Sequence, residues 1–153
     1  MGTRGITKVF DASINHKKQQ KNIIINLYRQ YDSYLTCHGK ELSEFLLSGV
    51  LVYGYTDKKT RQFNGMGCLA AQLVTEFKKG VGNFYLYPTK MVMDCWQEFE
   101  YFVYSDGVEV YDSAYNKDSV PIFIGSYLQF SYFIKKHLDA ETKRRNNKDE
   151  EVY

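Results

Sequence analysis

The clearest pattern in the chain is a helical repeat of apolar residues between residues 66 and 79. The apolar residues share one helix face at positions i, i+3, i+4, i+7, i+8 and i+11 and are Met66, Leu69, Ala70, Leu73, Val74 and Phe77. Gly80 and Gly82 follow this run, and glycine commonly ends helices. The pattern predicts an amphipathic helix over residues 66–79.

A second helix is predicted near the C-terminus. Ser126 and Gln129 have the spacing of a capping box, in which two side chains satisfy free backbone N–H groups at a helix start. Apolar residues follow at helical spacing, so we expect a helix over residues 127–138. Residues 142–153 are charged and show no periodicity, and we expect them to form a frayed, flexible tail.

The remaining apolar segments predict one short helix, at residues 38–48, and six strands. Asp106-Gly107 lies between the last two strands and is typical of a type I′ hairpin turn. The expected strands are residues 4–10, 22–31, 51–55, 83–87, 97–104 and 108–111.

The main elements follow the order ββααβββα, without a regular alternation of strand and helix. This order indicates the α+β class: an antiparallel or mixed sheet with about three helices packed on one face. The chain has 153 residues, which fits one compact domain. We therefore expect a single α+β domain over residues 1–141, followed by the tail.

Composition narrows the class of protein. The sequence is 44% hydrophobic and 25% charged, which excludes collagen-like and disordered chains. No apolar run approaches the roughly 20 residues of a membrane span, and no secretory signal is recognisable. The cysteines, Cys37, Cys68 and Cys95, are too widely spaced for a disulfide framework or a zinc site. We expect a cytoplasmic protein with no membrane association.

Charge is distributed unevenly although the net charge is only +2. Residues 1–31 are basic, whereas residues 91–116 contain six acidic residues and no Lys or Arg. Such separation can steer a ligand or a self-complementary partner, or it can mark ordinary solvated faces. Because an acidic segment would repel a duplex, nucleic acid is disfavoured as a partner.

The segment Asn64-Gly65-Met66-Gly67 resembles a glycine-rich dinucleotide fingerprint. The residues before it are polar and basic, whereas the fingerprint requires a preceding apolar strand. Two glycines at a helix start still allow backbone N–H groups to approach an anion. The alternative is close helix–sheet packing, with Asn64 as the N-cap.

An apolar strand changes abruptly into aromatic and hydrogen-bonding residues at positions 28–34, as strands facing a cleft often do. Arg29 could hold a phosphate or carboxylate with two hydrogen bonds, and Tyr28 or Tyr31 could stack on a planar group. Asp32 could accept from a hydroxyl or orient Arg29. A surface ion pair between Arg29 and Asp32 is the simpler alternative.

His38 opens the next predicted helix and could bind an anion, act as a base or cap the helix. Arg4 would lie near Arg29 if the first two strands pair as a hairpin. Two guanidinium groups would then border one pocket and attract an anion. A solvated Arg4 is the alternative.

Known catalytic motifs are absent, so we predict no catalytic residue, no metal site and no cofactor. Cys68 in a first helical turn would suit a nucleophile if exposed, and His38 could serve as its base. Nothing in the sequence fixes the distance between them, and a buried Cys68 is the simpler interpretation.

Several segments resemble a family of small proteins of tailed bacteriophages and large DNA viruses. They lie within residues 1–112 and read MGTRG, LYRQYDSY, HGKEL, FNGMGCLAAQL and YLYP. Residues 33–37 depart from the Gly-Tyr-Pro-Ser-Gly found there in the family. The resemblance implies a viral origin, hence a host-cell cytoplasmic location, and little about mechanism. By analogy with other small phage proteins, it suggests a counter-defence binder.

These observations favour a non-catalytic, homo-oligomeric protein that binds a small anionic ligand, plausibly nucleotide-derived. The expected ligand-binding residues come from four segments and are Arg4, Tyr28, Arg29, Tyr31, Asp32, His38, Asn64, Gly65 and Gly67. One alternative is an enzyme acting on a nucleotide or ADP-ribosyl substrate through His38 with Asp32 or Cys68. Another is a module that binds a host protein through exposed tyrosines.

Overall fold

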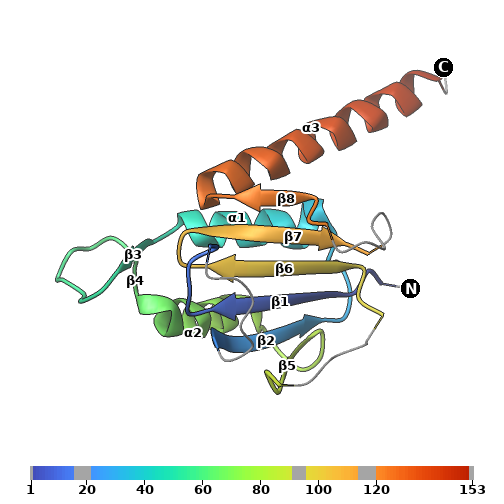
Figure 1. Ribbon diagram of the computed structural model, residues 1–153. Coiled ribbons are helices and arrows are strands. Elements are labelled where there is room, and N and C mark those ends of the chain that lie inside the picture. The colour runs from blue at the N-terminus through green and yellow to red at the C-terminus, as the bar shows by residue number, and fades with distance from the viewer. Residues whose placement is uncertain (1, 16–21, 91–95, 114–119, 152–153) are drawn as a thin grey trace.

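The computed structural model describes residues 2–15, 22–90, 96–113 and 120–151 (Figure 1). A six-stranded mixed sheet forms its centre, with strand order β5-β2-β1-β6-β7-β8. β1 pairs parallel with β6, and the other neighbours pair antiparallel. The strands are β1 (Gly5–Phe10), β2 (Ile23–Arg29), β5 (Phe84–Tyr87), β6 (Phe99–Tyr104), β7 (Gly107–Asp112) and β8 (Phe123–Gly125).

Three helices accompany the sheet, and the chain has the expected α+β architecture. α1 (Lys40–Leu47) and α2 (Gly65–Phe77) lie behind the sheet in Figure 1. α3 (Tyr127–Glu151) packs against α1 and β8 and then runs away from the rest of the molecule. A second, two-stranded parallel sheet joins β3 (Val50–Val52) to β4 (Gln62–Asn64), directly before α2.

The main core lies between the helices and the inner face of the sheet. Alternate residues of β1, β2, β6 and β7 point inward and meet the apolar faces of the helices. Leu69 and Leu73 of α2 are fully buried, as the helical repeat predicts, and so are Phe130 and Ile134 of α3. Burying each such side chain stabilises the fold by about 1.5–3 kcal/mol.

The hairpin between β6 and β7 exists, but its turn differs from the prediction. Tyr104 pairs with Gly107, so the turn residues are Ser105 and Asp106 rather than Asp106 and Gly107. Neither turn residue has the positive φ that a type I′ turn requires. The Asp106 carboxylate instead accepts a hydrogen bond from the Ile14 backbone N–H at 2.9 Å, a long-range contact that turn statistics cannot anticipate.

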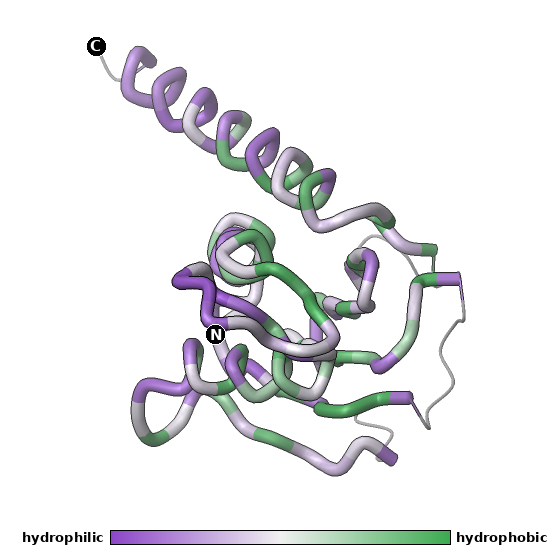
Figure 2. Tube along the Cα trace, turned by 90° about the vertical axis from the view of Figure 1, so that its left-hand side faces the viewer, coloured by the Kyte–Doolittle hydropathy of each residue, from purple (hydrophilic) through white to green (hydrophobic). Residues whose placement is uncertain are grey.

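The predicted ends of two helices are wrong. α1 begins at Lys40, because residues 35–39 form a π-helical turn that places His38 inside the fold. α3 continues to Glu151 instead of ending near residue 138. Its far part is exposed and hydrophilic (Figure 2), so hydrophobic periodicity carries no signal there. The segment still consists mostly of good helix formers and contains no Gly or Pro.

Two short strands were not predicted. β4 contains one buried apolar residue, Phe63, between Gln62 and Asn64, and β8 is equally short. Three residues are too few to show the alternation on which strand prediction depends. A strand therefore does precede α2, but it belongs to the small sheet rather than to the central one.

Candidate functional site

Arg29 ends β2 and is buried, with only 6% of its surface exposed. Its Nε donates to the Tyr31 carbonyl at 2.9 Å, and its Nη1 donates to Glu41 Oε2 at 2.7 Å. The same Nη1 contacts His38 Nδ1 at 3.1 Å, and Nη2 lies 3.7 Å from Cys37 Sγ. Four of the five guanidinium hydrogens are thus directed at protein groups. A bidentate pair of hydrogen bonds from Arg29 to a ligand would require Arg29 to break its hydrogen bond to Glu41.

His38 lies beneath Arg29 and is 1% exposed. Arginine can only donate hydrogen bonds, so His38 Nδ1 must accept from it and the ring proton sits on Nε2. That proton points to Thr7 Oγ1, 2.7 Å away. Burial, followed by the charge of Arg29, lowers the pKa of His38 from 6.5 to about 3. The imidazole is therefore neutral near pH 7, and both of its nitrogens are occupied.

The cysteine beside this network is not activated. Cys37 Sγ donates to Glu41 Oε1 at 3.8 Å. Burial and the neighbouring Glu41 carboxylate raise the pKa of the Cys37 thiol, and Arg29 opposes this only in part. Since the thiolate is the reactive form of cysteine, Cys37 is a poor nucleophile here.

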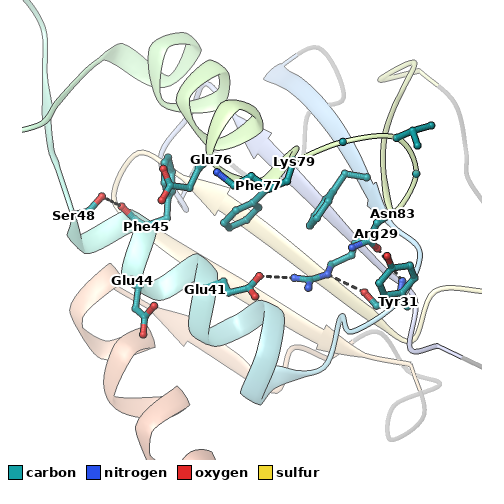
Figure 3. A pocket seen from close by; sticks show the side chains of 14 residues that line it. Arg29, Tyr31, Glu41, Glu44, Phe45, Ser48, Glu76, Phe77, Lys79 and Asn83 are labelled. Carbon is teal, nitrogen blue, oxygen red and sulfur yellow. Dashed lines mark hydrogen bonds and ion pairs between the residues drawn. The ribbon is translucent and has the colours of Figure 1, made fainter.

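An open cleft of about 730 Å³ lies in front of the network, between α1, the end of α2 and the loop that leads into β5 (Figure 3). Its volume is in the range typical of small-molecule sites. Four aromatic side chains line it: Tyr31, Phe45, Phe77 and Phe84. Charged side chains line it as well: Arg29, Glu41, Glu44, Glu76 and Lys79.

All three carboxylates of the cleft have cationic partners. Glu41 pairs with Arg29, Glu44 pairs with Lys40 at 3.1 Å, and Glu76 pairs with Arg61 at 3.3 Å. Within the described parts of the chain, Lys79 has neither an ion pair nor a hydrogen bond. The cleft therefore presents one uncompensated positive charge, at the end of α2.

The loop after α2 is tied to the end of β2. Lys78 Nζ donates to the carbonyls of Gly82 and Phe84 at 2.9 and 2.7 Å. Asn83 adopts a positive φ of 61°, and its side chain accepts from the Tyr31 N–H at 3.3 Å. Its carbonyl also accepts from the Gln30 N–H at 2.8 Å. These bonds hold Lys79 and Tyr31 on the same cleft.

The structure brings only part of the predicted site together. Arg29 and Tyr31 line the cleft, and His38 lies beneath its floor. Asn64, Gly65 and Gly67 lie at the opposite end of the 13-residue α2, roughly 20 Å from its C-terminal end. The expectation that Asn64, Gly65 and Gly67 bind the same ligand as Arg29 is therefore wrong for this cleft.

The other predicted residues also lie outside the cleft. Tyr28 is on the opposite face of the sheet, beside Tyr85 and Tyr87. Arg4 lies over the Trp96 ring at 6.0 Å, and Asp32 is exposed in the turn after β2 with a φ of 62°. Asn64 occupies the N-cap position of α2 but makes no cap hydrogen bond.

Phe77 and Lys79 were not identified as site residues from the sequence. The helical repeat places Phe77 on the apolar face of the predicted helix, and Lys79 lies outside that repeat. The local signal was present, because a basic residue and two glycines follow the helix directly. The sequence pattern does not show that this end of the helix packs beside β2, because that depends on tertiary contacts.

The pairs considered for catalysis are not assembled. Cys68 lies in the first turn of α2 and accepts from Gln72 Nε2 at 3.3 Å, whereas His38 contacts Phe77 in the last turn. His38 does not reach Asp32, because both of its ring nitrogens are bound elsewhere. Over the described residues, no group of three His, Cys, Asp or Glu side chains could hold a metal ion.

Comparison with known proteins adds no functional assignment. No protein-family model, no curated protein and no solved structure matches the chain. No helix within the described ranges is long and apolar enough to cross a membrane. What the cleft binds must therefore be inferred from its own side chains.

Glu41 and Glu44 provide a matched test of the network, since both lie on α1 and both form ion pairs. Glu41→Ala leaves the buried Arg29 charge without its carboxylate and should lower the free energy of unfolding by about 2 kcal/mol. Glu44→Ala breaks an exposed pair and should cost at most about 0.5 kcal/mol. Urea unfolding near pH 7 measures both values. Equal losses would show that Arg29 does not depend on Glu41.

His38 should make stability sensitive to acid. Its pKa is 6.5 in the unfolded chain and about 3 in the folded protein, so only the unfolded chain binds this proton between those values. The free energy of unfolding should therefore fall as pH drops below about 6.5, by up to about 1.4 kcal/mol per pH unit. His38→Gln should remove this contribution. Urea unfolding between about pH 6 and pH 4 tests it, and parallel curves for the two proteins would refute it.

Proposed function

We propose that the protein is a non-catalytic binder of a small, planar, anionic ligand of the nucleotide class, held in the cleft between α1 and the end of α2. The observation that carries the proposal is a cleft of about 730 Å³ lined by four aromatic side chains, with Lys79, which has no partner among the described residues, at its edge. Small-molecule sites combine aromatic and apolar surface with polar groups that fix the orientation of the ligand.

The aromatic walls support a planar ligand. Phe77 lies between Phe45 and Phe84, with ring centroids 6.1 and 5.8 Å away. Tyr31, 47% exposed, stands at the rim and offers an apolar ring with a hydroxyl. A ring system entering the cleft would cover apolar surface and make offset or edge contacts with these side chains.

The charges favour a ligand with few negative groups. An anionic group near Lys79 would form a charge-assisted hydrogen bond without displacing an existing partner. Glu41, Glu44 and Glu76 also face the cleft, and their negative charges would oppose a triphosphate. A monophosphate, a cyclic phosphate or a carboxylate suits this balance better.

Arg29 has a supporting role in this proposal instead of the direct ligand contact expected from the sequence. Its hydrogen bonds to Tyr31 and Glu41 position two residues of the cleft. Arg29→Ala would therefore disturb the fold together with the site, which makes it a poor test of binding. Lys79 is exposed and can be changed without breaking a described contact.

The viral resemblance suggests a biological use for such a binder. A virus gains from a protein that sequesters a host signalling nucleotide, and that action requires binding without turnover. We extend the proposal to this counter-defence role and to a homo-oligomeric assembly in the host cytoplasm. An enzyme acting on the same ligand class remains the principal alternative, and a host-protein partner is the second.

Native mass spectrometry of the protein after exposure to a nucleotide-rich cell extract tests the proposal. Wild type should carry an intact small-molecule adduct, and the same spectrum reports the number of subunits. Lys79→Glu should lower adduct occupancy roughly tenfold or more, because it removes one charge-assisted contact. Lys136→Glu changes an exposed lysine of α3 outside the cleft; it is the matched control and should bind like wild type.

Two outcomes would contradict this account. An adduct retained by Lys79→Glu would place the site elsewhere. Depletion of one extract component with no adduct would indicate catalysis, so the enzyme alternative would replace the binder.

A further inference from the structure

The loop between β3 and β4, residues 53–61, projects well beyond the sheets (Figure 1). It carries two of the most exposed aromatic side chains of the described residues, Tyr53 at 80% and Tyr55 at 75%. The two tyrosines are only two residues apart in the chain, and grouped exposed apolar side chains are typical of interaction sites. We call residues 53–61 the tyrosine loop.

Side chains of β4 hold the tyrosine loop in place. Asn64 Oδ1 accepts from the Gly54 N–H at 2.8 Å. The Gln62 side chain accepts from the Thr56 N–H at 3.0 Å and donates to Thr56 Oγ1 at 3.1 Å. These bonds limit the conformations of the loop, so less ordering is needed when a partner binds.

The tyrosine loop also carries unpartnered positive charge. Lys58 and Lys59 are exposed and make no ion pair or hydrogen bond to any residue that the structure describes. Arg61 is different, because it turns back to Ser48, Gln72 and Glu76. The outer part of the loop therefore presents two ammonium groups, two rings and a single carboxylate, Asp57.

We propose that the tyrosine loop binds single-stranded nucleic acid. Tyr53 and Tyr55 would stack on bases, and Lys58 and Lys59 would contact phosphates. Sequence-tolerant single-strand binding depends on this pairing of aromatic rings with positive charge. A protein partner fits less well, because a stable protein interface needs about 800 Å² from each side and a nine-residue loop offers a small contact area.

Within residues 96–113, the part of the acidic segment that the structure describes, Glu98 and Asp106 are exposed, but the other acidic side chains are covered at least in part. Glu109 and Asp112 are buried, and Glu100 is half-buried in the sheet. Repulsion by this acidic segment also applies mainly to duplexes, because duplex recognition requires a protein element that enters a groove. A projecting loop with stacking rings engages unpaired bases instead.

Fluorescence anisotropy with a fluorescein-labelled oligothymidylate of about 15 nucleotides tests the proposal at about 50 and 200 mM salt. Wild type should bind, and more weakly at the higher salt. Tyr53→Ala/Tyr55→Ala should lower affinity roughly tenfold or more. Lys58→Glu/Lys59→Glu should lower affinity and also reduce the slope of log affinity against log salt by about 1.4.

Matched controls separate this loop from the rest of the surface. Tyr132→Ala removes an exposed tyrosine on α3, and Lys136→Glu changes an exposed lysine on the same helix; both should bind the oligonucleotide like wild type. Tyr53→Phe/Tyr55→Phe keeps the rings and should retain affinity, so a loss caused by misfolding of the alanine variant can be recognised. Circular dichroism checks that each variant is folded.

Three results would overturn the proposal. Absence of wild-type binding at the lower salt would remove nucleic acid as a partner. Unchanged affinity in the tyrosine variant, with a loss only in the lysine variant, would show diffuse electrostatic attraction without stacking. An equal loss in the control variants would place the contact outside the tyrosine loop. None of these results bears on small-ligand binding in the cleft, which its own experiment tests.

Discussion

The charge of Arg29 is the constraint on which this end of the molecule depends. A guanidinium that is almost fully buried costs several kcal/mol unless hydrogen bonds and an opposite charge compensate it. Glu41 of α1, His38 of the π-helical turn and the Tyr31 carbonyl supply that compensation. Since these groups come from three consecutive segments, satisfying one side chain fixes how the chain passes from β2 into α1.

The two cations that line the cleft, Arg29 and Lys79, have different roles. Arg29 uses its N–H groups for hydrogen bonds within the protein and forms part of the floor of the cleft. Lys79, at the end of α2, makes no described contact and is available to a ligand. The carboxylates of the cleft are paired as well. Recognition in the proposed function then depends on aromatic surface and on one available cation, and the tyrosine loop combines similar groups on a separate surface.

Local sequence patterns predicted the α+β class, five of the six central strands and the position of α2, because each has enough residues to show its period. They did not predict β4 and β8, which are too short, or the far part of α3, which buries no apolar face. Arg29 and Tyr31 were expected at the site and line the cleft. Phe77 and Lys79 were missed, and Asn64 was misplaced, because only tertiary packing decides which end of α2 meets β2. The buried position of His38 depends likewise on its bonds to Thr7 and Arg29, which lie far apart in the sequence.

The ring of His38 reports directly on whether an internal network holds Arg29. Long-range proton–nitrogen NMR spectra of the histidine rings distinguish the two neutral tautomers from the charged imidazolium. At about pH 7 and again at about pH 5, His38 should be neutral with its proton on Nε2, because Nδ1 accepts from Arg29. A proton on Nδ1, or an imidazolium at about pH 5, would show that Arg29 does not donate to this ring and would contradict the account.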